Sequence, residues 1–300
     1  MLDKNNQVYV IIRGKKYFVQ KGELNLTDVS CSLSEIERLD DLQDLEVLIL
    51  QNNNLSKIEN LEKLINLKLL DFSWNCLTDI QGLDNLNSLE TLRFGSGTHS
   101  GNRISEIKNL EALTNLRQLW LPENEVIEIK GLENLDKLET LNLNTNKIKE
   151  IKGLDNLRNL KELYLDFNKI EEIKGVENLE NLEHLDLSYN HIKEIKGLDN
   201  LINLRNLSLR GNSLVEVKNL GRLKNLEYLN LDDNDIIELK GLETLKSLEI
   251  LDLSRNKIKQ LEGLDSLDNL KEIYLYGNRL ISDSDITLNS LMNKGVRIYK

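Results

Sequence analysis

The sequence has little proline, which interrupts regular structure, and little cysteine, which could cross-link it. Its 300 residues include one proline and two cysteines, and aromatic residues make up 5% of the chain. Two cysteines exclude a small disulfide-rich scaffold, and no stretch approaches the ~18 consecutive apolar residues of a membrane-spanning helix. The N-terminus also lacks the apolar segment and small-residue cleavage site of a signal peptide. From these absences we expect no membrane association, a cytoplasmic location, and free thiols at Cys31 and Cys76.

Clustered positive charge is missing as well. The chain carries 39 Lys and Arg against 50 Asp and Glu, a formal net charge of −11 at pH 7. A nucleic-acid interface needs basic side chains gathered on one surface to displace counterions from phosphates. No polybasic run is present, so we expect no nucleic-acid partner.

What the sequence does contain is one asparagine that returns every 22 residues, with a single longer interval. Around it lies the frame L-x-x-L-x-L-x-x-N-x-I-x-x-I-x-G-L-x-x-L-x-x, which residues 138–159 follow closely (LETLNLNTNKIKEIKGLDNLRN). Self-similarity at this period indicates stacked repeats that form one solenoid rather than two ordinary domains. The recurring asparagines are Asn53, Asn75, Asn102, Asn124, Asn146, Asn168, Asn190, Asn212, Asn234, Asn256 and Asn278.

The frame is the leucine-rich-repeat signature, and the chain resembles that family over roughly residues 23–282. The resemblance implies an α/β right-handed solenoid curved like a horseshoe, with a parallel β-sheet on the concave face and 3₁₀ turns or short helices on the convex face. Alternation in the L-x-L segment points its leucines inward. Apolar residues three apart on the return leg suit 3₁₀ turns. We expect a sheet of ~12 strands.

We expect a single domain over residues 1–300 with a cap at each end, because the terminal repeats of a solenoid otherwise expose its core. Residues 95–101 (GSGTHSG) interrupt the period and predict a loop at the rim of the concave face, where it would contact a partner. The predicted parts are a β-hairpin cap at 1–22, a degenerate repeat at 23–44, eleven repeats at 45–281 and a C-terminal cap at 282–300.

Both ends depart from the frame. In the degenerate repeat, Cys31 occupies the asparagine position and Asp28 falls where an apolar strand residue is expected. After the last repeat, the pattern predicts a helix over 282–293 with Met292 on its buried face, then a final strand at 296–299.

Two residue types are expected to close each turn. The recurring asparagine, which we call the ladder asparagine, offers donors and an acceptor to backbone groups that leave the sheet. Seven residues later most repeats place glycine and three place asparagine, which tolerate positive φ and predict a left-handed turn. These positions are Gly82, Gly131, Gly153, Gly175, Gly197, Gly241 and Gly263, with Asn60, Asn109 and Asn219.

The strand positions that alternate with the leucines form the predicted binding surface on the concave face. They gather large aromatic residues, the usual hot spots of protein interfaces, among carboxylates, whereas Phe72 and Phe94 point inward. Mere stacking of the aromatics along the sheet is the alternative. We expect contact with a partner at Trp74, Trp120, Tyr164, Phe167, His184, Asp186, Tyr189, Arg210, Tyr228, Asp232, Tyr274 and Tyr276.

Nothing in the sequence predicts catalysis, a metal site or a cofactor. The three histidines lack partners at metal-ligand spacing, and no nucleophile motif is present. Carboxylates spread over an open sheet lack the pocket that separates acid from base. The glycine-rich 95–101 segment lacks the lysine of a phosphate-binding loop.

The I-x-x-I-x-G-L repeat is similar to the phosphatase-regulatory-subunit class, and second to internalin-like repeats. The first resemblance implies binding of a folded protein on the concave face, at Trp74, Trp120, Tyr164, Phe167 and Tyr189. The chain departs from that class because no proline follows residue 122 to form its L-P-x-L cap segment. We expect a monomeric, non-enzymatic scaffold whose protein partner offers a basic patch around an apolar centre. The alternatives are a regulatory subunit of a signalling enzyme, such as a protein phosphatase or GTPase, and a secreted or surface internalin-like adhesin.

Overall fold

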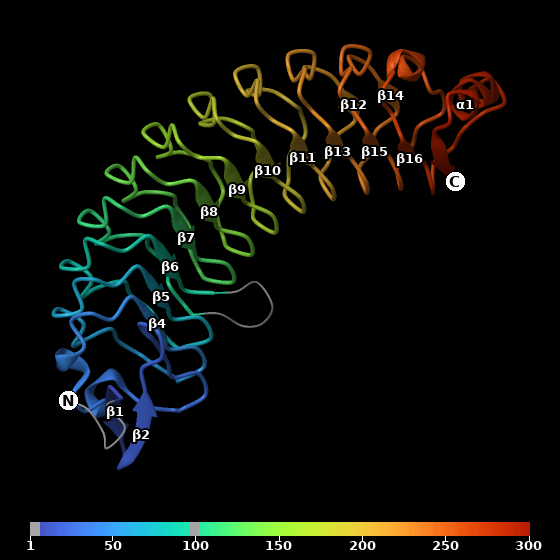
Figure 1. Cartoon of the computed structure of the whole chain (residues 1–300). Helices are drawn as coiled ribbons and strands as arrows, with labels where there is room; N and C mark the ends of the chain where they lie inside the picture. The colour runs from blue at the N-terminus through green and yellow to red at the C-terminus, as the bar shows by residue number, and fades with distance from the viewer. Residues whose placement is uncertain (1–6, 96–101) are drawn as a thin grey trace. The chain divides into compact units, whose positions relative to one another are not determined.

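The computed structural model describes residues 7–95 and 102–300, which fall in two compact units, 1–147 and 148–300 (Figure 1). Beyond Gly95, the predicted contact loop at 95–101 lies outside the described residues. Each unit is a stack of turns with a parallel sheet along one side, so the parallel-sheet solenoid expected from the repeat is confirmed. The single domain over 1–300 stays a prediction.

The first unit begins with the predicted hairpin, in which β1 (Tyr9–Ile12) pairs antiparallel with β2 (Lys15–Phe18). Two 3₁₀ helices, η1 (Leu33–Glu35) and η2 (Leu39–Asp41), lie between the first two strands of the parallel sheet, which are β3 and β4 of the strands given next. Six strands then run parallel in chain order: β3 (Glu23–Asn25), β4 (Val47–Ile49), β5 (Leu69–Asp71), β6 (Thr91–Arg93), β7 (Gln118–Trp120) and β8 (Thr140–Asn142).

The second unit continues the pattern with seven parallel strands: β9 (Glu162–Tyr164), β10 (His184–Asp186), β11 (Asn206–Ser208), β13 (Tyr228–Asn230), β15 (Ile250–Asp252), β16 (Glu272–Tyr274) and β17 (Arg297–Tyr299). On its return legs β12 (Glu216–Val217) and β14 (Glu238–Leu239) form a second, short parallel pair, and η3 (Leu264–Ser266) is a single 3₁₀ turn. The predicted last strand is present as β17, which pairs with β16.

The predicted C-terminal helix is α1 (Ser284–Asn293). Leu288 and Leu291 are buried, but Met292 is 51% exposed, so its expected place on the buried face is wrong. Met292 follows Leu291 directly, and adjacent residues point to different sides of a helix. None of the helices in the described part of the chain is long and apolar enough to cross a membrane.

The core of each turn is the set of leucines and isoleucines that the frame places inward. In a typical strand the central leucine is buried and its two neighbours are partly exposed, as in β10, where Leu185 is fully buried. The expected inward position of Phe72 and Phe94 is confirmed, because both are fully buried and their ring centroids lie 5.7 Å apart. Alternation along each strand therefore sorts core side chains from surface ones.

The ladder asparagines bond the backbone as predicted. At Asn190 the side-chain Oδ1 accepts the Ile170 N–H at 2.9 Å, and Nδ2 donates to the Leu165 and Leu187 carbonyl oxygens at 2.9 and 3.1 Å. Asn256 repeats this arrangement. Buried backbone groups left without such partners would cost free energy. The expected left-handed turns are also confirmed, with φ between 57° and 78° at all ten glycines and asparagines seven residues after the ladder position.

The degenerate first repeat has a different register from the one expected. Leu24 pairs with Leu48, a separation of 24 residues rather than 22, so the inward residues are Leu24 and Leu26. Asp28 is therefore no misfit at an apolar position, because it lies in a left-handed turn with φ 62°. Cys31 keeps its expected place in the ladder row: its N–H donates to Asn53 Oδ1, as the N–H of Asn53 does to Asn75 Oδ1. Cys31 and Cys76 are free thiols, as expected, one buried and one exposed.

Charged side chains of alternating sign stand directly before the strands. Within each unit, neighbours along this row form ion pairs: Lys68 Nζ lies 2.9 Å from Glu46 Oε1, and Arg205 Nη1 lies 2.6 Å from Glu227 Oε1. The row reads Glu46, Lys68, Glu90, Arg117, Glu139, Lys161, Glu183, Arg205 and Glu227. Opposed charges on neighbouring strands favour this register, each exposed pair by at most ~1 kcal/mol.

Candidate functional site

The outward strand residues of each unit form a continuous surface, which we call the sheet face. Parallel pairing in register lays equivalent positions side by side: Tyr164, Asp186 and Ser208 are successive partners on β9, β10 and β11. Side chains of one row therefore meet their equivalents in the next repeat. The two units are described in turn.

The sheet face of the first unit carries Trp74 and Trp120, both half-buried. The Arg93 guanidinium carbon lies 5.6 Å from the centre of the Trp120 ring, a cation–π contact. Asp71 is 2% exposed and accepts hydrogen bonds from Gln51 Nε2 and the Ser73 N–H, both at 2.8 Å. Here the carboxylate is used within the sheet and the tryptophans provide the outward apolar surface.

On the second unit, Phe167 and Tyr189 make a stacked aromatic pair with ring centroids 4.3 Å apart and an interplanar angle of 16°. Phe167 is 50% exposed. The Arg210 guanidinium carbon lies 5.2 Å from the Tyr189 ring centre. A Cβ added at Gly211 would come within 2.5 Å of Tyr189 Cδ1, so the absence of a side chain there is what lets the ring lie flat. The Tyr189 ring is thus fixed between Phe167 and the Arg210–Gly211 segment, while the Phe167 ring remains half exposed to solvent.

Phe167 and Tyr189 both have a left-handed backbone conformation, with positive φ, which the repeat pattern did not predict. Among the described repeats, the residue directly before each ladder asparagine has positive φ, from 49° to 74°. Its N–H still bonds to the next repeat, as Tyr189 N–H does to the Arg210 oxygen at 2.6 Å, while the chain turns away from the sheet. The positions are Asn52, Trp74, Glu123, Thr145, Phe167, Tyr189, Gly211, Asp233, Arg255 and Gly277. Only Asn52, Asp233 and the two glycines among them are residue types that favour this turn.

A polar cluster lies beside the aromatic pair, on β9, β10 and β11. The Tyr164 and His184 ring centroids are 4.8 Å apart. Asp186 Oδ1 accepts the Ser188 N–H at 2.9 Å and its hydroxyl at 2.5 Å, and that hydroxyl lies 2.6 Å from the Ser208 hydroxyl. Asp186 is therefore engaged within the sheet while it remains partly exposed.

Burial shifts the titration of this cluster. Desolvation raises the pKa of Asp166 to about 6, and the charge of Asp186 adds to the effect. Desolvation likewise raises the pKa of Tyr164 to about 12, followed by the charge of Glu162. The pKa of His184 is lowered because burial disfavours the imidazolium, although Asp186 and Glu162 oppose this. Carboxylates crowded on a partly dry surface favour a cationic partner, since it would relieve their repulsion.

Two arginines flank a buried carboxylate further along the second unit. Asp232 is 5% exposed, its Oδ2 lies 3.1 Å from Arg210 Nε, and it also pairs with Arg255 Nη2. Burial raises the pKa of Asp232 first, Asp252 adds to the rise, and the two arginines oppose it. Asp232 thus lies beneath the guanidinium groups and orients them. Arg255 was not among the expected contact residues; it stands directly before ladder Asn256, at the position equivalent to Phe167 and Tyr189.

The remaining tyrosines differ in how far they are free to bind. Tyr228 accepts a bond from Asn230 Nδ2 at 3.1 Å. Tyr274 donates to Glu272 Oε2 at 2.7 Å and stacks on Tyr299 of β17 at 4.4 Å. Tyr276 is 67% exposed. Tyr274 therefore matches the stacking alternative, whereas Tyr276 presents its ring to solvent.

The described residues hold no group of three or more His, Cys, Asp or Glu side chains that could bind a metal ion. The sheet face presents aromatic rings and arginine side chains with carboxylates between them. This is the chemistry of a macromolecular contact surface.

Comparisons with known proteins agree with the repeat architecture. A family model described as Leucine Rich repeats (2 copies) matches residues 114–156, 158–200 and 246–290. The solved structure of an internalin (inlF) from Listeria monocytogenes is similar with a TM-score of 0.77 and 26% identity, over 93% of this chain and 86% of that chain. An internalin C2 (inlC2) from the same organism gives 0.57 and 29%, over 63% and 81%. The LRIM1/APL1C complex shares the fold, with a TM-score of 0.67 and 21% identity over 82% and 52%. No curated protein sequence matches the chain.

Proposed function

Because the chain is a leucine-rich-repeat protein, we propose that it is a non-enzymatic interaction module whose sheet face binds a folded protein. Solenoids of this family are protein-interaction modules, and stacked repeats present a long rigid surface without a pocket. Of the two resemblances expected from sequence, the internalin-like one has support from solved structures. The phosphatase-regulatory resemblance and the cytoplasmic location stay predictions.

The observation that carries the proposal is the stacked pair Phe167 and Tyr189. The solenoid core does not need these rings, and yet Phe167 stays 50% exposed on a backbone with φ 53°. Rigid, exposed aromatics lose little conformational entropy when a partner covers them, which makes them good anchors. Tyr276, at 67% exposure, is a second anchor of the same kind.

The charges around the pair define the partner. Asp166, Asp186 and Asp252 stand on the same face as Phe167 and Tyr189, and Asp233 is exposed beside them. A protein that offers Lys or Arg around an apolar centre would relieve their mutual repulsion and associate faster. We propose a partner with this arrangement.

The test begins with a partner captured by affinity purification from the native host and uses binding kinetics on surface variants. Phe167→Ala and Tyr189→Ala should each raise the dissociation rate ~10-fold or more, because they remove anchors. Asp233→Asn should instead lower the association rate and weaken its salt dependence. Asparagine suits the left-handed backbone at 233, where φ is 58°, so folding is not disturbed.

The matched control is Lys174→Ala on the return leg of the second unit. Its side chain is 48% exposed and its ammonium lies 3.9 Å from Glu150, so its loss should leave both rates unchanged. A captured partner whose binding is abolished by Lys174→Ala and untouched by Phe167→Ala and Tyr189→Ala would mean that the sheet face is not the binding surface.

A further inference from the structure

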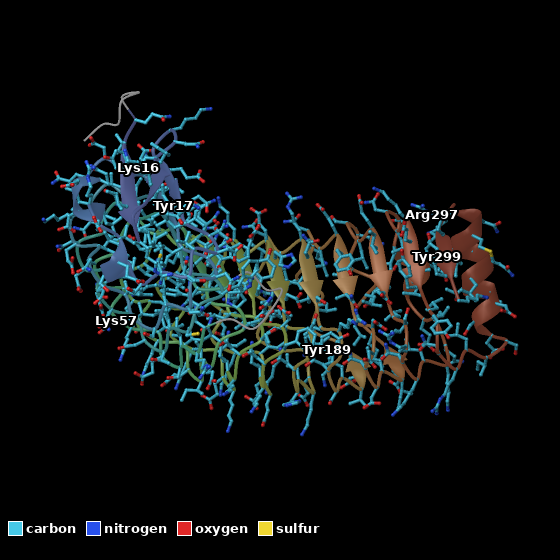
Figure 2. All side chains as sticks on the ribbon, turned by 90° about the horizontal axis from the view of Figure 1, so that it is seen from below. Lys16, Tyr17, Lys57, Tyr189, Arg297 and Tyr299 are labelled. Atoms are coloured by element: carbon cyan, nitrogen blue, oxygen red, sulfur yellow. The ribbon has the colours of Figure 1, made fainter. Side chains whose placement is uncertain are left out.

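The N-terminal hairpin carries a basic and aromatic surface of its own. Lys16 Nζ lies 4.0 Å from the centre of the Tyr9 ring, and the Arg38 guanidinium carbon lies 4.6 Å from it. Lys15 Nζ lies 5.0 Å from the Tyr17 ring, and Tyr9 packs against Phe18 with centroids 5.9 Å apart. We call these six residues the hairpin surface; Figure 2 labels Lys16 and Tyr17 on it. Cations held on ring faces make a preformed patch of positive charge around an apolar centre.

Of the three cations of this patch, Arg38 pairs with Asp41 at 3.7 Å, whereas Lys15 and Lys16 form no ion pair among the described residues. Many lysines of the repeats pair with carboxylates of the same or a neighbouring turn, as Lys108 does with Asp79 at 3.1 Å. Among the described residues, by contrast, no carboxylate lies within ion-pair distance of Lys15 or Lys16. Within residues 7–95 and 102–300 these two ammonium groups therefore have no partner carboxylate, although the chain has 50 acidic residues against 39 basic ones, and they can pair with another molecule.

The hairpin also has an open strand edge. Within the described part of the chain, β2 pairs with β1 alone, and the other edge of β1 is bridged to Glu37 at Ile11. The outward edge of β2 (Lys15–Phe18) therefore keeps backbone groups for a partner's polar atoms. Charge, rings and backbone groups stand on the same four residues.

These features match the partner that the sheet face of the second unit calls for. We propose that the hairpin surface of one copy docks on the sheet face of the second unit of another copy. The hairpin lysines would meet Asp166, Asp186 and Asp233, and Tyr17 and Phe18 would cover the Phe167–Tyr189 pair. The inference rests on the proposed function for the acidic surface and adds a partner of known sequence. It replaces the monomer expected from the sequence alone.

Such a contact joins two different surfaces, so every copy has one of each. The association is head to tail and continues into longer assemblies unless the geometry closes a ring. Because its charges are exposed, it should weaken steeply as ionic strength rises. An isologous dimer would instead stop at two copies.

The test measures mass by sedimentation velocity over a range of protein and salt concentrations. The unmodified protein should form concentration-dependent oligomers at low salt that dissociate at high salt. The double variants Lys15→Glu/Lys16→Glu and Phe167→Ala/Tyr189→Ala should each raise the apparent dissociation constant about tenfold or more. Lys149→Glu/Lys193→Glu carries the same charge change on exposed return-leg positions and should associate like the unmodified protein.

Mixing the two deficient variants is the decisive step. One copy then supplies an intact hairpin surface and the other an intact sheet face, so dimers should appear and nothing larger. A protein that is monomeric at every concentration, or deficient variants that fail to rescue one another, would overturn the head-to-tail contact. Circular dichroism of each variant should match the unmodified protein.

The same variants separate this inference from the proposed function. If Lys15→Glu/Lys16→Glu leaves capture of a foreign partner intact while no self-association is seen, the self-contact is wrong and the sheet-face function stands. If self-association is lost in Phe167→Ala/Tyr189→Ala but a foreign partner binds that variant normally, the self-contact stands and the proposed function fails.

Discussion

At the scale of single residues, the unexpected feature is the left-handed backbone before each ladder asparagine. The repeat imposes this conformation on whatever residue stands there, including Trp74, Phe167 and Tyr189. The left-handed conformation costs an L-residue with a Cβ on the order of 1 kcal/mol, and it costs asparagine less. The position points a side chain outward beside the sheet, which explains why the exposed stacked pair arises there.

Thr145 tests this cost because it is β-branched, exposed and held at φ 52°. Thr145→Asn should raise the free energy of unfolding by ~0.5–1 kcal/mol, since asparagine tolerates the left-handed region. The measurement is the urea midpoint. Thr78→Asn is the control, because Thr78 is exposed without positive φ and should be neutral. A Thr145→Asn midpoint equal to or below that of the parent would contradict the argument.

Asp166 predicts a pH dependence of stability. Its folded pKa of about 6 lies above the ordinary value of 3.8, so the folded state binds the proton more tightly than the unfolded chain. Its contribution is therefore fully present below pH ~4 and is lost as pH rises toward ~6. Asp166→Asn removes the repulsion and should be more stable than the parent at pH 7.5 by ~1 kcal/mol, after allowance for solvent screening. Near pH 3.5 the two should unfold at the same urea concentration.

At the scale of the elements, many of the turns carry a second row of asparagines beside the ladder row. The ladder row is buried, whereas the second row stands two residues before the alternating charges and is exposed. Its side chains donate hydrogen bonds to backbone carbonyl groups of the preceding repeat, as Asn203 Nδ2 does to the backbone oxygen of Glu180 at 2.9 Å. The row includes Asn66, Asn115, Asn181, Asn203, Asn225 and Asn269. The 22-residue period contains it, but an exposed asparagine in a polar stretch draws no attention from sequence.

The buried ladder row should contribute more to the free energy of unfolding than the exposed row. Asn190→Leu leaves the Ile170 N–H without its acceptor inside the turn and removes one of two asparagine donors from the Leu165 and Leu187 carbonyl groups, so we expect a loss of ~2–4 kcal/mol. Asn203→Ala frees one carbonyl that water can reach, and it should cost ~1 kcal/mol or less. Urea denaturation followed by circular dichroism gives both values. Equal losses would mean that the exposed row is as necessary as the buried one.

At the scale of the whole molecule, the repeat made the architecture predictable, because one frame places the strand and the inward leucines of each of the eleven regular repeats. The prediction for the first repeat was wrong at its strand, where two extra residues shift the register, so Asp28 was misplaced. The site was less predictable, since the frame says which side chains face outward but not what they meet there. Asp232 is covered by two arginines and Tyr274 by Tyr299, and such contacts between rows appear only once neighbouring strands are in place.

The alternating charges before the strands bear on how such a chain can change its length over evolution. Gain or loss of a single repeat keeps the leucines and asparagines in phase but sets like charges side by side at the new junction. Gain or loss of two repeats preserves both patterns, so the unit of duplication that electrostatics favours is 44 residues, twice the 22-residue period. The sign alternates from Glu46 to Glu227 and fails once, where Glu249 follows Glu227. An odd number of repeats gained or lost at that point would leave this trace in the present sequence.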